Sequence, residues 1–105
     1  MKVGTGLELA IDELYCTGWS ALDSIGCEHT GDGKVYPSVV RVQKEFAQLG
    51  YELQVGHIQL FDCFRAEWTD VVGNPVGAVV GSSEIEAAIY ALARLRRNLK
   101  VGVNP

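Results

Sequence analysis

Hydrophobic and polar residues alternate most regularly in the middle of the chain. Between residues 64 and 69 every second residue is apolar, a period typical of a strand with one buried face and one solvated face. The apolar positions are Phe64, Ala66 and Trp68, and the polar positions are Arg65, Glu67 and Thr69. This segment predicts the central strand of a small sheet.

Two further strands are expected on either side of it. Leu53 and Val55 alternate with polar residues, and the apolar positions then change parity at Ile58 and Leu60. A bulge at Gly56 would account for that change. After a turn at residues 73–75, the apolar residues Val76, Ala78 and Val80 predict a short last strand.

Apolar residues recur at helical spacing in three other segments. The first, residues 6–16, opens with a Thr5–Glu8 capping box and stops near Gly18. The second, residues 37–49, has Pro37 near its first position and Gly50 at its end. Its expected buried stripe is Val39, Val42, Phe46 and Leu49.

The last helix opens with a second capping box, Ser83 and Glu86, and carries the longest apolar stripe. The stripe consists of Ile85, Ala88, Ile89, Leu92, Leu95 and Leu99. Residues 26–34 contain three glycines and read as a loop, and Trp19, Leu22 and Ile25 fit either a short helical turn or a packed loop.

These elements predict one α+β domain spanning residues 1–105, since a chain of this length suits a single core. The order is α-α-β-β-β-α. We expect a three-stranded antiparallel sheet with helices packed on one face, because only the face with Phe64, Ala66 and Trp68 is apolar.

Short motifs resemble two known kinds of domain. A helix, three strands and a helix is the order of a double-stranded-RNA-binding domain, and the run Gly77–Ser83 followed by an alanine-rich helix with Ala87-Ala88 resembles the end of that domain. However, Ser83-Glu84-Ile85-Glu86 replaces the phosphate-binding lysines of that family. RNA binding is therefore not implied. Four short motifs are similar to those of small phage-type ABA-sandwich domains: Gly18-Trp19, Tyr36-Pro37-Ser38, Glu67-Trp68 and Glu86-Ala87-Ala88. That resemblance implies the fold and a bacterial or phage origin, and it implies no biochemical activity.

Charge and composition narrow the classes of function. The net charge is −4 and the pI about 5.0, which argues against a nucleic-acid partner. One basic cluster, Arg94, Arg96, Arg97 and Lys100, ends the last helix, where it suits the helix dipole or an acidic partner. With three cysteines, no secretory signal and no membrane-spanning run, the sequence predicts a cytosolic protein with reduced thiols.

Cysteine and histidine residues are the candidates for a metal site or a catalytic site. Cys27, His29, His57 and Cys63 would form a zinc site if they met in space, although their spacing matches no familiar zinc module. A nucleophilic Cys63 would need His57 and a carboxylate in contact, and Asp62 points to the other side of a strand. The alternative function is therefore a metal- or cysteine-dependent enzyme or a zinc-binding module that uses these residues.

The remaining motifs have ordinary structural explanations. The glycines at 31–33 and 73–77 are read as turns rather than phosphate loops, and the pairs Asp12/Glu13 and Glu84/Glu86 as solvated surface. Five aromatic residues exceed what a small core holds: Trp19, Tyr36, Tyr51, Phe61 and Tyr90. We therefore expect a non-catalytic interaction or accessory domain, without a cofactor, that binds a protein partner or forms a homodimer.

Overall fold

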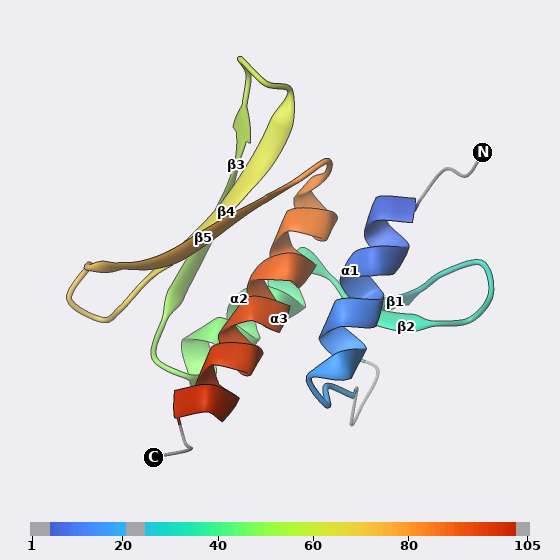
Figure 1. Cartoon of the computed structure of the whole chain (residues 1–105), viewed down its shortest axis with the longest axis horizontal. Coiled ribbons are helices and arrows are strands. Elements are labelled where there is room, and N and C mark those ends of the chain that lie inside the picture. The colour runs from blue at the N-terminus through green and yellow to red at the C-terminus, as the bar shows by residue number, and fades with distance from the viewer. Residues whose placement is uncertain (1–4, 21–24, 103–105) are drawn as a thin grey trace.

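The protein is α+β, as the alternation and periodicity predict. A computed structural model describes residues 5–20 and 25–102. The elements, in chain order, are α1 (Thr5–Cys16), β1 (Cys27–His29), β2 (Val35–Pro37), α2 (Val39–Gln48), β3 (Glu52–Ile58), β4 (Cys63–Thr69), β5 (Pro75–Gly81) and α3 (Glu84–Gly102). Figure 1 shows α2 and α3 on one side of the β3–β4–β5 sheet, with α1 packed against α3.

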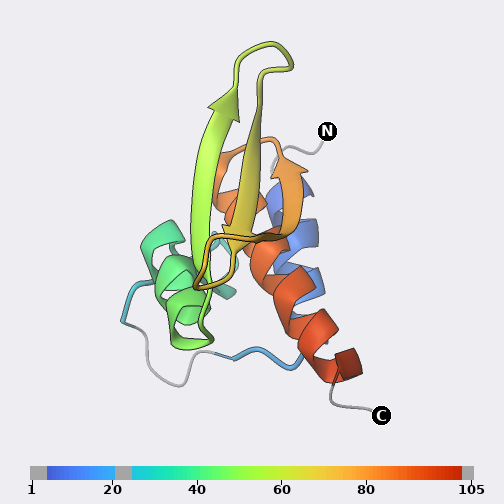
Figure 2. The same cartoon turned by 90° about the vertical axis from the view of Figure 1, so that its left-hand side faces the viewer.

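The sheet is antiparallel, in the order β3-β4-β5. Its outer face is turned to the viewer in Figure 2, with the helices behind it and the β3–β4 hairpin extending beyond them. Ala66 and Trp68 are buried on the inner face, while Arg65 and Glu67 on the outer face are exposed. The central alternation is thus confirmed.

The predicted bulge at Gly56 is wrong. Gly56 pairs with Arg65 in an uninterrupted ladder, so Leu53, Val55 and His57 all keep to the inner face. The apolar parity changes instead because the end of the hairpin extends past the helices, where neither face is covered. The register shift lies beside Trp68 and Thr69, whose partners Gly77 and Pro75 leave Val76 as the extra residue on β5.

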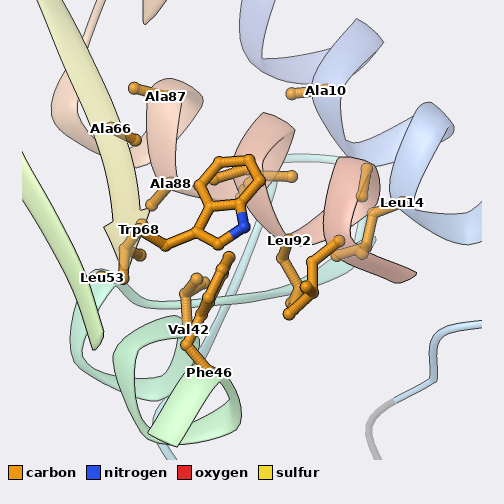
Figure 3. Packing of buried hydrophobic residues seen from close by; sticks show 14 of the residues in the cluster. Ala10, Leu14, Val42, Phe46, Leu53, Ala66, Trp68, Ala87, Ala88 and Leu92 are labelled. Carbon is orange, nitrogen blue, oxygen red and sulfur yellow. The ribbon is translucent and has the colours of Figure 1, made fainter. Parts of the chain in front are cut away.

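The core is built around one tryptophan. Trp68 reaches from β4 to Val42 and Phe46 of α2 and to Ala88 and Leu92 of α3 (Figure 3). Its ring meets the Phe46 ring at a centroid distance of 5.3 Å and an angle of 58°. Small residues on α3 let the neighbouring elements approach closely. These are Ala87, Ala88, Ala91 and Ala93, all fully buried.

The helix ends agree with the sequence in part. Gly18 and Gly50 adopt positive φ and follow α1 and α2, as predicted. Pro37 is not in α2: it ends β2, and Ser38 caps the helix by accepting the Arg41 N–H at 3.2 Å. Leu49, predicted to be buried, is 48% exposed. The Thr5 side chain of the first capping box lies outside the described residues.

The second capping box forms with one change. Ser83 Oγ accepts the Glu86 N–H at 3.1 Å, and the Glu86 carboxylate accepts the Ser82 N–H at 2.6 Å rather than that of Ser83. Glu86 is 6% exposed, and a Cβ added to Gly6 would lie 2.2 Å from its Oε2 atom. This carboxylate therefore fixes the start of α3 and lies directly against the start of α1.

Residues 26–34 are not simply a loop. Cys27–His29 pairs with Val35–Pro37 as a two-stranded antiparallel hairpin, closed by the Thr30 N–H bond to the Lys34 carbonyl at 2.9 Å. Gly33 has a φ of 92°, which suits glycine at such a turn. The choice between a helical turn and a packed loop at 19–25 falls mostly on residues 21–24, outside the described part. Trp19 is buried and Ile25 is exposed.

A single carboxylate organises the turn that leads into β5. Asp70 Oδ1 accepts the N–H groups of Val72 at 3.0 Å and Asn74 at 2.9 Å. The hydrogen bond from the Asn74 N–H is the main reason that the pKa of Asp70 lies below its ordinary value. The folded chain therefore stabilises the ionised form of Asp70, and the hydrogen bonds of this carboxylate fix the turn before β5.

Replacing Asp70 with asparagine is expected to make stability less sensitive to acid. Because the folded pKa is lowered, the carboxylate contributes fully above its ordinary pKa of 3.8, and this contribution is lost as the pH falls through the lower folded value. Urea unfolding should show Asp70→Asn less stable than wild type at neutral pH, with a gap that narrows below about pH 4. The control Glu52→Gln, at an exposed strand position, should show no such narrowing. A constant gap at every pH would contradict the role given to Asp70.

Candidate functional site: the open edge of the sheet

The β5 edge of the sheet is exposed and uncharged. β5 has β4 on one side, and no strand among the described residues pairs with its other side. Its sequence, Pro-Val-Gly-Ala-Val-Val-Gly, contains no charged residue, and its proline stands at the first position. Soluble proteins usually protect such an edge with a charge, a proline or a covering segment, because its free N–H and C=O groups accept another strand.

The opposite edge is built differently. β3 carries Glu52, Gln54 and His57, all exposed, and so has the polar side chains that discourage strand pairing. A helix packs against each edge strand, α2 against β3 and α3 against β5. The two edges of one sheet therefore differ in the charge of their side chains, and β5 is the uncharged one.

A groove lies beside Val79 and Val80 of β5, on the helix side of the sheet. It has a volume of about 310 Å³ and is lined by Val79 and Val80 of β5, by Glu13 of α1, and by three residues of α3. The α3 residues are Tyr90, Arg94 and Arg97. Neighbouring residues of a strand point to opposite faces, so a hollow that touches both Val79 and Val80 reaches the edge of the strand. The groove and the free backbone groups thus form one continuous surface.

The side chains of the groove have distinct roles. Arg97 Nη1 lies 3.5 Å from Glu13 Oε1, an exposed ion pair that links α3 to α1. Burial raises the pKa of Tyr90 above its usual range, and the nearby Glu86 and Glu13 carboxylates add to the shift. Its hydroxyl is therefore a neutral donor at neutral pH. Arg94 is exposed and has no hydrogen bond or ion pair to any side chain in the described ranges.

A larger hollow, of about 500 Å³, lies between α2 and the connection from α1. Its charged residues are largely paired: Glu45 accepts hydrogen bonds from the Trp19 indole at 3.1 Å and from Arg41 Nε at 2.9 Å. Ser20 and Ile25 line it and flank residues 21–24, which are outside the described part. We assign no site to it.

The four predicted zinc ligands are not brought together. Cys27 and His29 lie on the β1–β2 hairpin, while His57 and Cys63 lie on the separate β3–β4–β5 sheet. Within residues 5–20 and 25–102, no three His, Cys, Asp or Glu side chains are close enough to hold a metal ion. The geometry therefore gives this hypothesis no support.

The cysteine-nucleophile hypothesis fares no better. His57 pairs with Phe64 across the ladder and Ile58 with Cys63, so His57 and Cys63 are on opposite faces of the sheet. The His57 ring packs on Phe64 at 4.9 Å, and its Nε2 atom lies 3.1 Å from Asp62 Oδ1. His57 and Asp62 do meet, but the thiol is not beside them. All three cysteines are free.

The basic cluster separates into residues with different environments. Arg96 Nε donates to Thr17 Oγ1 at 2.9 Å, which ties α3 to the end of α1. Arg97 and Arg94 line the groove. The Lys100 side chain lies outside the described residues.

The predicted carboxylate pairs are only partly solvated surface. Asp12 accepts a hydrogen bond from Lys34 Nζ at 3.1 Å, and Glu13 faces Arg97. Glu86 is buried.

Most of the five aromatic side chains that were expected to be exposed are buried or half-buried. Trp19 is buried, and Tyr36, Tyr51 and Tyr90 pack partly against the core. Phe61 is 71% exposed, next to Leu60 in the β3–β4 turn. The unpartnered apolar surface comes instead from aliphatic residues, including Val76 and Val80 of β5, which are 48% and 56% exposed. Sequence reasoning did not single out β5, although residues 71–83 contain no charged side chain.

Comparison with known proteins adds no relative. The chain has no significant match to a family model, a curated protein or a solved structure. The resemblance to phage-type ABA-sandwich domains therefore stays a prediction. None of the helices in the described ranges is sufficiently long and hydrophobic to cross a bilayer.

Proposed function

We propose that this chain is a small protein-interaction module that binds an extended segment of a partner protein as a further strand beside β5. One observation carries the proposal: β5 is an uncharged edge strand, and the groove at its side is lined from both faces of the strand, by Val79 and Val80. Strand addition needs both features, because main-chain hydrogen bonds supply affinity and an adjoining groove receives alternate side chains.

The bound segment would contact two surfaces. Residues facing inward would lie over Tyr90 and Val79 in the groove, and those facing outward would lie beside Val80 on the outer face. Such binding needs no catalytic group, metal or cofactor. Three cysteines at irregular spacing are not the pattern of a disulfide framework, and on that ground we propose a cytosolic location.

A pair of proline variants tests the binding mode. Adjacent residues of a strand direct their N–H groups to opposite sides, so of Ala78 and Val79 one donates toward β4 and the other points outward. Ala78→Pro and Val79→Pro therefore form a matched pair of variants. One removes a hydrogen bond between β5 and β4 and destabilises the fold, and the other leaves the fold intact and blocks the open edge. Thermal unfolding identifies which is which.

Selection from a displayed library of random linear peptides, each of about ten residues and so longer than a typical strand, supplies the ligand. We expect the folded proline variant to bind the selected peptides at least about tenfold more weakly than wild type, since it loses a main-chain hydrogen bond and clashes with the added strand. Equal binding to wild type and to the folded variant would refute strand addition at β5. A selection that enriches no peptide over bare support would refute the proposed function.

A further inference from the structure

Among the described residues, Arg94 is the cation of the groove that has no charged partner. Tyr90, Arg94 and Arg97 follow one another at i, i+4 and i+7, so they share one face of α3. Glu13 faces Arg97 at 3.5 Å, which leaves Arg94 uncompensated within the described part of the chain. Two arginines and one glutamate line the groove, so the lining itself has a charge of about +1. The Glu86 carboxylate near Tyr90 is not part of this lining and accepts the Ser82 N–H at 2.6 Å. The whole chain has the opposite sign, at −4.

We propose that the partner segment is acidic: it places an Asp or Glu side chain on Arg94 and an apolar side chain on Tyr90. This inference rests on the proposed function, since it names the chemistry of the strand that β5 receives. Alternate residues of a strand lie about 6.7 Å apart on one face. Tyr90 and Arg94, four residues apart on a helix, are separated by about 6 Å along its axis. An apolar residue and a carboxylate two positions apart therefore match the groove.

Two other occupants fit the groove less well. A second copy of this chain would meet β5 across a twofold axis, and an isologous interface would set each positive groove against its own copy. A nucleic acid would present a row of phosphates to one unpaired cation on a chain of net charge −4, whereas such binding depends on several Lys or Arg contacts. One carboxylate on the partner matches Arg94, the arginine of the groove that has no partner in the described ranges.

Charge reversal at Arg94 tests the inference. The variant Arg94→Glu alters an exposed side chain that makes no hydrogen bond or ion pair within the described residues, and Lys44→Glu on α2 makes the same charge change at an exposed position outside the groove. Random linear peptides would be selected in parallel against wild type and both variants. We expect wild type and Lys44→Glu to enrich Asp or Glu two positions from an apolar residue, and Arg94→Glu to lose this preference.

Affinity and competition measurements complete the test. The best selected peptide should bind Arg94→Glu about tenfold more weakly than Lys44→Glu, and high salt should reduce that difference. Peptides blocked by the folded proline variant but without an acidic preference would overturn this inference and leave the proposed function standing. Peptides that bind the folded proline variant as tightly as wild type would overturn both this inference and the proposed function. A wild-type dimer in light scattering, or poly(U) RNA bound through Arg94 more tightly than the peptide, would also overturn it.

Discussion

The Trp68→Ala variant is expected to lose about 3–5 kcal/mol of the free energy of unfolding. Trp68 is 1% exposed and joins the sheet to both α2 and α3. Its removal would leave a cavity among Phe46, Ala88 and Leu92, which are held by separate elements and cannot all move inward together. Since small domains have about 5–15 kcal/mol in total, the variant should be close to unfolded. Urea unfolding followed by circular dichroism measures the loss.

Trp68→Phe is the matched control. It keeps an aromatic ring against Phe46 and removes the indole N–H, which is buried and has no hydrogen-bond partner in the described part of the chain. Relief from that unpaired donor offsets part of the lost volume, so we expect a loss of about 1 kcal/mol. A Trp68→Ala loss no greater than that of Trp68→Phe would contradict the central place of this ring in the core.

The Gly77→Ala variant is expected to lose about 1–3 kcal/mol, a large effect for one methyl group. A Cβ at Gly77 would lie 2.4 Å from Cζ2 of Trp68, whose ring is rigid, 1% exposed and packed on Phe46. Gly56 is also a strand glycine, and a Cβ there would meet nothing within 4 Å. Gly56→Ala should therefore be neutral or slightly stabilising, because alanine restricts the unfolded chain. Thermal and urea unfolding compare the two.

A double-variant cycle separates the clash from other effects of the substitution. Phenylalanine at position 68 lacks the Cζ2 atom that the new methyl group would meet. The cost of Gly77→Ala should accordingly fall by about 1 kcal/mol or more in the Trp68→Phe background. Additive costs would show that the two residues are not in the contact described.

Sequence periodicity predicted the elements with long repeats. Phe64, Ala66 and Trp68 face inward as their alternation requires, and α3 buries Ile89 and Leu92 as its spacing requires. The β1–β2 hairpin was missed because three-residue strands are too short to show a period, and glycines surround their turn. After Gly56 the apolar residues move from odd to even positions, and this change was wrongly attributed to a bulge. It depends on where the helices end along the sheet, which only the tertiary structure determines.

The candidate site was harder to predict for a physical reason. Glu13, Val79 and Arg97 are far apart in the sequence and meet only because α1 and β5 flank α3. The lack of charge in residues 71–83 was visible, but it becomes informative only when β5 is known to be an edge strand. Conversely, Cys27, His29, His57 and Cys63 drew attention by residue type, although the fold separates them between two sheets.

Backbone hydrogen exchange tests the central claim, that β5 is an open edge which receives another strand. In the free protein, the β5 amides that point away from β4 should exchange rapidly, because no described group accepts their hydrogen bonds. Saturation with a selected peptide should slow these amides by about tenfold or more and leave the β3 amides unchanged. Protection that appears on β3, or a bound peptide that leaves the β5 amides as fast as before, would contradict the account.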